Sequence, residues 1–192
     1  MDDGGRVFLR PYRPGDETEV FAAIRESVEE LSRWMPWCHP GYSIEEARAW
    51  IEHCGVARAR RSEFHFVIED ESGAFLGTCG LNQMRVEHRM ANLGYWVRTS
   101  AAGRGVATRA VTSLADFAFR ETDLVRLEIV VALDNLRSMR VAEKSGAIRE
   151  GIAHQRLRIH DRSEDAVVYA ILRPSGLPPP ASRNPSTERA PG

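Results

Sequence analysis

The stretch Ala101–Val111, AAGRGVATRAV, places two glycines, Gly103 and Gly105, directly before an apolar run with helical spacing. The start of a helix exposes unpaired backbone N–H groups and carries a partial positive charge. Glycines beside such a start let an anion approach the backbone closely. The stretch therefore predicts a turn into a helix, and it is compatible with a loop that binds phosphate.

Three hypotheses fit this stretch. In the first, the glycines only make the turn between a strand and a helix. In the second, they belong to a dinucleotide-binding fold, but Thr108 occupies the place of that motif's third glycine. In the third, the backbone N–H groups of residues 104–108 and the Thr108 hydroxyl hold the diphosphate of coenzyme A. A Walker loop is excluded, because no Gly-Lys-Ser/Thr ending follows the glycines.

Hydrophobic periodicity and turn residues predict the remaining elements. Helices are expected from Asp16, from the capping box Ser43–Glu46, after Gly105, and from Asn135 to Ser145. Strands are expected at residues 6–12, 63–69, 74–83, 90–98, 124–132, 147–159 and 165–172. The order predicts an α+β fold with a mixed, mostly antiparallel central sheet of about seven strands flanked by about four helices. We expect one domain over residues 1–173, followed by a disordered Pro-rich tail at residues 174–192.

Composition limits the classes of partner. The net charge of −1 over 192 residues argues against nucleic acid as a partner. Three cysteines without CxxC spacing indicate neither a disulfide framework nor a zinc site, and no metal is expected. No apolar run reaches the length of a membrane span or a signal peptide, so we expect a cytoplasmic protein without membrane contact.

Three further stretches complete a pattern with GRGVAT (103–108): LGYWV (93–97), RLEIVVALDNLRSMRVAEKSGA (126–147) and DAVVYAIL (165–172). Together they resemble the GNAT superfamily of acyl-CoA-dependent N-acyltransferases, and most of all its RimJ/RimL-type branch. The resemblance extends over residues 7–172 and implies acetyl-CoA as cosubstrate. It also implies a splayed parallel strand pair whose gap holds the pantetheine arm. The family's phosphate loop aligns with residues 102–107, and Ala102 stands where a long polar side chain is usual.

The resemblance also assigns roles to individual residues. In this sequence it implies that acetyl-CoA is bound by Trp96, Val97, Arg98, Gly103, Arg104, Gly105, Val106, Ala107, Thr108, Asn135 and Ser138. A Trp96 or Val97 N–H is the expected oxyanion donor, with Gly94 as a site of strand irregularity. Ser138 is expected to protonate or hydrogen-bond the leaving thiolate. Trp34, Trp37 and His154 are the expected acceptor-site residues, with the two tryptophans in a wall of that site.

The general base is open between several groups. Glu128 interrupts an apolar strand, where partial desolvation would suit a base, but an ion pair with Arg126 or Arg98 explains it equally well. The family's other base position falls near Leu157, which cannot accept a proton, and His154 lies close by in the sequence. A chain of water molecules is the remaining alternative.

These features predict transfer of an acetyl group from acetyl-CoA to a primary amine, either a peptide N-terminus or a small amine. Because no cysteine lies near the loop in the sequence, direct attack in a ternary complex is expected. Two alternatives stay open: an acyl-CoA-binding module without turnover, and a nucleotide-binding oxidoreductase. Both a monomer and a homodimer are compatible with the sequence.

Overall fold

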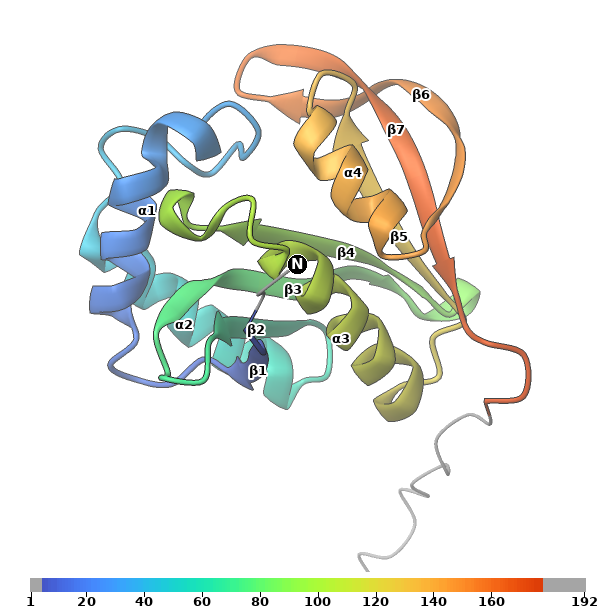
Figure 1. Ribbon diagram of the computed structural model, residues 1–192, viewed down its shortest axis with the longest axis horizontal. Coiled ribbons are helices and arrows are strands. Elements are labelled where there is room, and N and C mark those ends of the chain that lie inside the picture. Colours follow the sequence, from blue (N-terminus) through green and yellow to red (C-terminus); the bar gives the residue numbers. More distant parts are fainter. Residues whose placement is uncertain (1–4, 178–192) are drawn as a thin grey trace, which may run out of the picture.

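The computed structural model describes residues 5–177 and contains a seven-stranded sheet in the order β1-β2-β3-β4-β5-β7-β6 (Figure 1). The strands are β1 (Phe8–Pro11), β2 (Phe64–Glu69), β3 (Phe75–Arg85), β4 (Met90–Val97), β5 (Arg126–Ala132), β6 (Ile148–Ile159) and β7 (Arg162–Leu172). All neighbouring pairs are antiparallel except β4 and β5, which are parallel. The α+β fold expected from the sequence is confirmed.

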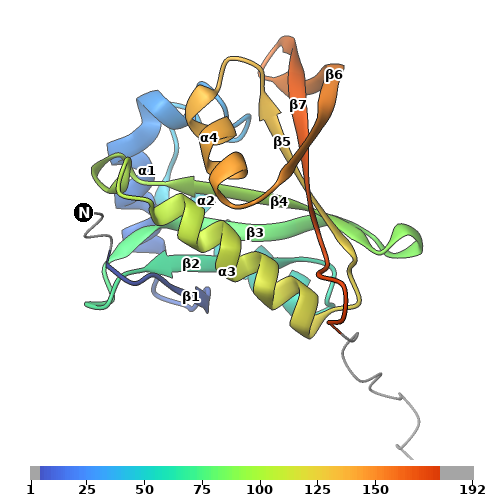
Figure 2. The ribbon, with the colours of Figure 1, turned by 45° about the vertical axis from the view of Figure 1, so that its right-hand side comes forward.

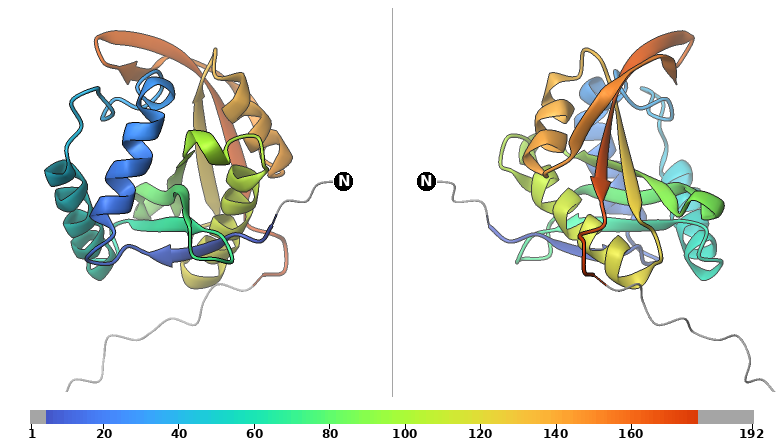
Figure 3. Two further views of the ribbon diagram at one scale, coloured as in Figure 1. Left: turned by 60° about the vertical axis from the view of Figure 1, so that its left-hand side comes forward. Right: turned by 90° about the vertical axis from the view of Figure 1, so that its right-hand side faces the viewer.

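Two pairs of helices cover the sheet (Figures 2 and 3). Helices α1 (Glu17–Leu31) and α2 (Ile44–Ala59) pack on one face, and α3 (Val106–Glu121) and α4 (Leu136–Lys144) lie on the other. The buried residues accordingly form two clusters, a large one under α3 and a smaller one under α1 and α2. The β6–β7 hairpin extends above the helices as an arm.

Local sequence signals explain where the helices begin. Ser43 and Glu46 form the expected capping box, in which the Ser43 side chain accepts from the Glu46 N–H and Glu46 accepts from the Ser43 N–H. Gly105 precedes α3 with φ of +71°, a left-handed conformation that glycine adopts at little cost. The α3 residues Val111 and Leu114 are fully buried, as their spacing predicted.

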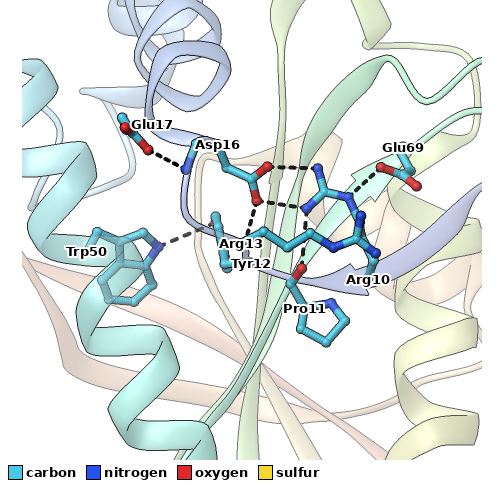
Figure 4. Close-up of polar contacts among 9 residues, drawn as sticks. Arg10, Pro11, Tyr12, Arg13, Asp16, Glu17, Trp50 and Glu69 are labelled. Atoms are coloured by element: carbon cyan, nitrogen blue, oxygen red, sulfur yellow. Dashed lines mark hydrogen bonds and ion pairs between the residues drawn. The ribbon is translucent and has the colours of Figure 1, made fainter.

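A buried ion network joins β1 to the start of α1 (Figure 4). Arg10 forms a bidentate pair with Asp16, with N–O distances of 2.7 and 3.0 Å, and its Nε lies 2.7 Å from Glu69 of β2. Asp16 also accepts from the Arg13 N–H at 2.8 Å. These carboxylates raise the pKa of the Arg10 guanidinium above its ordinary value. The network fixes the short β1–α1 connection, which carries Tyr12 into the space beneath α2.

The parallel pair separates after three residues. Only Met90–Asn92 of β4 are in register with Arg126–Glu128 of β5. Beyond Asn92 the two strands diverge, while β4 keeps its register with β3 as far as Val97. The expected splayed pair is therefore present. The divergence begins two residues before Gly94, and Gly94 itself stays in register with Gly80 of β3.

Other expectations concern the cysteines, the chain end and membranes. All three cysteines are free and buried. Arg173 and Leu177 lie against the domain: the Arg173 guanidinium stacks over Phe119, and Leu177 packs on the large core cluster. The remainder of the predicted tail, residues 178–192, lies outside the described residues. Within residues 5–177, no helix is long and apolar enough to span a membrane.

Candidate active site

The glycine loop before α3 presents unused backbone donors. Gly103 and Gly105 both have positive φ, +76° and +71°. Across the described part of the chain, no hydrogen bond uses a backbone N–H of residues 103–108 as donor. Arg109 supports the loop from inside the helix, donating from Nη2 to the Arg104 carbonyl at 2.8 Å. A row of unpaired N–H groups at a helix start is a binding site for an anion.

The segment leading into this loop is fastened to α1. Glu26 accepts from the Arg98 guanidinium and, at 2.8 Å, from the Ser100 N–H. Ser27 accepts from the Thr99 N–H at 2.9 Å. The hydrogen bonds from Arg98 and then Ser100 lower the pKa of Glu26 to about 2. Sequence reasoning missed Glu26 and Ser27, because an exposed Glu on an amphipathic helix gives no sign of its partner.

Two backbone hydrogen bonds define which β4 backbone groups face the gap between β4 and β5. The Arg98 N–H donates to Leu76 of the β3 side, and Arg89 accepts from Val125 of the β5 side. Because backbone groups along a strand alternate in direction, even-numbered residues of β4 face β3 and odd-numbered residues face β5. The N–H of Val97 therefore points into the gap, and the N–H of Trp96 points to Thr78 of β3.

Ser138 lies in the first turn of α4, where Asn135 is the N-cap and accepts from its N–H at 3.1 Å. The Ser138 hydroxyl is 2.8 Å from the Tyr95 hydroxyl of β4, which also donates to the Ser138 carbonyl at 3.1 Å. Burial raises the pKa of Tyr95 to about 12, so its phenol is protonated at neutral pH. Two linked hydroxyls thus stand beside the gap between the strands. The Tyr95 contact was not expected from the sequence.

A cavity of about 830 Å³ occupies the α1/α2 side of the sheet and reaches Ser138 and Tyr95. Its floor is formed by β3 and β4, including Gly80, Gly94 and Trp96. Trp34 and Trp37 line it, as expected for the acceptor site, and Trp37 is 41% exposed. Its remaining walls come from α2, the end of β5 and the β6 arm, which contributes Leu157. The cavity thus connects the α1/α2 side of the sheet with the hydroxyl groups of Ser138 and Tyr95.

The two sequence candidates for a general base lie elsewhere. Glu128 is paired with Arg126 at 2.8 Å, and Arg126 also binds Glu150 of β6. This is the ion pair that the sequence had left as an alternative. The His154 side chain is 83% exposed and lies 2.8 Å from Asp165 of β7. Neither Glu128 nor His154 is among the residues that line the cavity.

A histidine–carboxylate cluster, which the sequence analysis did not identify, lines the cavity under α2. Glu63 Oε2 is 2.8 Å from His65 Nε2 and 3.0 Å from His53 Nε2. The two imidazole nitrogens and the carboxylate oxygen lie within 4.8 Å of one another, and this is the one group of three His, Cys, Asp or Glu side chains this close together within the described residues. The i, i+2 spacing of Glu63 and His65 at a strand start was the available signal. His53 belongs to α2, so only the tertiary structure brings it close to Glu63 and His65.

Comparisons with known proteins agree with this geometry. Residues 6–148 match the family model described as "Acetyltransferase (GNAT) domain". The chain belongs to the GNAT acetyltransferase family. A "Probable N-acetyltransferase YjcK" from Bacillus subtilis is 33% identical over 177 residues, covering 91% of this chain and 98% of that one.

Two further GNAT relatives indicate the branch. The "Ribosomal-protein-serine acetyltransferase" of Escherichia coli is 28% identical over 155 residues, covering 80% of this chain and 85% of that protein. A solved structure described as "Mycobacterium smegmatis RimJ in complex with CoA-disulfide" superimposes with a TM-score of 0.79 at 27% identity, covering 88% and 83% of the two chains. The resemblance to the RimJ/RimL-type branch is confirmed, and the protein is an N-acetyltransferase of the GNAT family.

Proposed function

We propose that this GNAT protein transfers the acetyl group of acetyl-CoA to a primary amine, with an N-terminal amine of a protein as the favoured acceptor and a small amine as the second. The observation that carries the proposal is the continuity of three features: a loop of unpaired amides, a gap between β4 and β5, and a large cavity beyond it. A long cosubstrate and a separate acceptor can therefore meet in the gap from opposite sides.

Residues 103–108 hold the diphosphate of acetyl-CoA through their backbone N–H groups, with the Thr108 hydroxyl as an additional donor. Ala102 lacks the long polar side chain usual in the family, and the Arg109 contact to the Arg104 carbonyl supports the loop instead. The pantetheine arm lies in the gap and pairs with the odd-numbered backbone groups of β4. The Arg98 N–H is not free to bind the arm, because it donates to the Leu76 carbonyl, so Arg98 only holds the end of β4 in place.

Acyl transfer requires a polarised carbonyl, a neutral amine and a protonated leaving group. The Val97 N–H serves as the oxyanion donor, because it faces the gap and the Trp96 N–H does not. Ser138 donates a proton to the departing thiolate and regains one from the acceptor amine as the amide forms, while Tyr95 holds the Ser138 hydroxyl in place through the 2.8 Å contact. The amine attacks directly, because the nearest cavity-lining thiol, Cys79, is buried and its pKa is raised by desolvation.

The large cavity favours a polypeptide N-terminus over a compact amine. Indole and phenol rings line it, with Trp37 and Trp96 ring centroids 6.2 Å apart. The aromatic part of the cavity, on the α1/α2 side of the sheet, can accommodate side chains of an extended peptide. The E. coli relative is described as acting on a ribosomal protein, which is in keeping with this class of acceptor.

The proposal is tested by thiol release from acetyl-CoA across a panel of peptides and amines. We expect turnover with peptides that carry a free N-terminus, none with the same peptides after N-terminal acetylation, and weaker turnover with polyamines. Calorimetry with acetyl-CoA and with NAD provides the cofactor control. Acetyl-CoA binding without thiol release from any amine would favour a binding module, and binding of NAD alone would contradict the proposal.

A further inference from the structure

The cavity contains a histidine placed to accept a proton. His65 belongs to β2, is 8% exposed, and faces the α2 side of the sheet. Its Nε2 is bonded to Glu63 Oε2 at 2.8 Å. In the described part of the chain its Nδ1 has no hydrogen-bond partner. A carboxylate that accepts from one ring nitrogen selects the tautomer in which the other nitrogen carries a lone pair.

The position of Nδ1 follows from the glycines beside it. His65, Gly80 and Gly94 lie directly opposite one another on β2, β3 and β4. The imidazole lies over Gly80, because a Cβ added at Gly80 would be 2.3 Å from His65 Nδ1. Because Gly80 and Gly94 have no side chains, the sheet face at these positions is uncovered between His65 Nδ1 and the gap between β4 and β5.

Cavity water can carry a proton over the remaining distance. Two strand spacings, about 10 Å, separate the backbones of His65 and Gly94, and the imidazole covers the first of these spacings by lying over Gly80. The proposed oxyanion donor, Val97, lies three residues beyond Gly94 along β4, about 10 Å farther. A proton from an amine that attacks at the gap therefore reaches Nδ1 through a chain of water molecules.

We propose that His65 is the general base of this acetyltransferase and that Glu63 is a positioning residue that holds its tautomer. The proposal rests on the function proposed above and deepens it. The acceptor enters as an ammonium ion and transfers one proton to His65 Nδ1. Its lone pair forms the C–N bond, and the C–S bond breaks with the electron pair going to sulfur. The second amine proton reaches sulfur through Ser138, and the imidazolium later releases its proton to water.

The groups around His65 agree with this role. Burial lowers the pKa of His65, against an opposing effect of Glu63, so the imidazole is neutral at physiological pH. Burial acts to raise the pKa of Glu63, but hydrogen bonds from His65 and His53 lower it overall and keep it ionised. Tyr12 from the β1–α1 connection and Cys54 from α2 have raised pKa values, chiefly through burial, and remain neutral.

The main test replaces His65 with glutamine. Gln at position 65 can still donate to Glu63 but cannot take up a proton. We expect kcat at pH 7 to fall by about 100-fold or more, and acetyl-CoA affinity to stay unchanged in calorimetry. The variant's rate should keep rising with pH, because only amine already deprotonated in solution then reacts. His88→Gln, an exposed histidine in the turn before β4, is the matched control and should behave as wild type.

Gly80→Ala tests the geometry without removing a titratable group. The added methyl collides with the imidazole and displaces Nδ1, so kcat should fall while acetyl-CoA affinity is retained. If His65→Gln keeps the wild-type rate and pH profile, the proposal is wrong. A stoichiometric divalent metal held by purified protein, and lost in His65→Gln, would assign the cluster to a metal and also overturn it.

A measurement without acceptor separates this proposal from the proposed function. Nitrogen-15 NMR of the histidines at pH 7 should show His65 as the neutral tautomer protonated at Nε2. A His65 protonated at Nδ1 would overturn the base assignment even in an enzyme that turns over. Wild-type protein that shows the expected tautomer but releases no thiol with any amine would contradict the proposed function instead.

Discussion

The glycine loop offers backbone groups to a ligand, whereas the acceptor cavity is lined by side chains. The loop is a backbone site: its donors are the N–H groups of residues 103–108, and two glycines with positive φ give them their direction. The cavity is a side-chain site, and its walls come from both helices of the α1/α2 layer, the four strands β2 to β5 and the β6 arm. A backbone site tolerates changes in neighbouring side chains, whereas a side-chain site changes with each substitution. This difference explains how one family holds one cosubstrate and accepts many amines.

The largest expected effect comes from Gly105→Asp. The substitution places a β-carbon at φ of +71° and a negative charge at the diphosphate position, so acetyl-CoA affinity should fall by about 100-fold or more. Calorimetry measures the loss. Gly146→Asp is the control, because Gly146 has φ of +79°, has open space around it, and lies at the far end of α4. Retained affinity in Gly105→Asp would show that the diphosphate binds elsewhere.

Ser138→Ala tests the point where the two regions meet. Removing the hydroxyl takes away the proton donor for the thiolate, so kcat should fall by about 100-fold with little change in acetyl-CoA affinity. Steady-state kinetics and calorimetry together measure this separation. Ser145→Ala, on the same helix and bonded only to the Val141 carbonyl, should have the wild-type kcat. Equal rates for both variants would remove Ser138 from the mechanism.

Glu26→Gln tests how the loop depends on α1. The folded-state pKa of Glu26 is about 2, below its ordinary value of 4.5. The carboxylate therefore contributes stability that is fully present above about pH 4.5 and is lost as pH falls towards 2. We expect the variant to be about 1 kcal/mol less stable than wild type at pH 7.

The difference between wild type and Glu26→Gln should shrink when denaturant unfolding is repeated at lower pH. Glu29→Gln is the matched control on α1, since Glu29 is exposed and its ion pair is with Arg33, two residues past the end of α1. A difference that stays constant between pH 7 and pH 3 would contradict the ion pair with Arg98.

The smallest effect is expected for Glu128→Gln. Because this carboxylate is bonded to Arg126 and does not line the cavity, the pH–rate profile should match that of wild type. Stability should change by less than about 1 kcal/mol. Glu150→Gln, which alters the other carboxylate on Arg126, should behave in the same way. If the pH–rate profile of Glu128→Gln no longer showed the fall in rate at low pH that wild type shows, Glu128 would be the base. That result would contradict the role of His65.

Much of the fold could be predicted because its signals are local. The capping box at Ser43, the stripe on α3 and the N-cap at Asn135 each depend on residues a few positions apart. The splayed parallel pair was expected from the resemblance to the family, whereas the order of the strands in the sheet was not predicted. The irregularity was expected at Gly94, but the β4–β5 register already ends at Asn92, while β4 keeps its register with β3 past Gly94.

The site could be predicted only in part. Trp34, Trp37 and Ser138 lie at the cavity, as expected, because their segments have fixed places in the family's architecture. Glu128 and His154 face other partners, and no pattern along the chain distinguishes a carboxylate that faces a cavity from one that faces an arginine. His65 was overlooked because its i, i+2 spacing from Glu63 does not reveal that the pair lines a cavity or that His53 joins it.

By itself, the sequence determined the family, the helices and the glycine loop, because these depend on backbone conformations that nearby residues dictate. Only the tertiary structure decided which side chains share the cavity. His65, Glu63 and His53 come from a strand, its preceding loop and a helix, and their meeting depends on the packing of α2 on β2. Contacts across such an interface arise from the whole fold, so no short stretch of the chain encodes them.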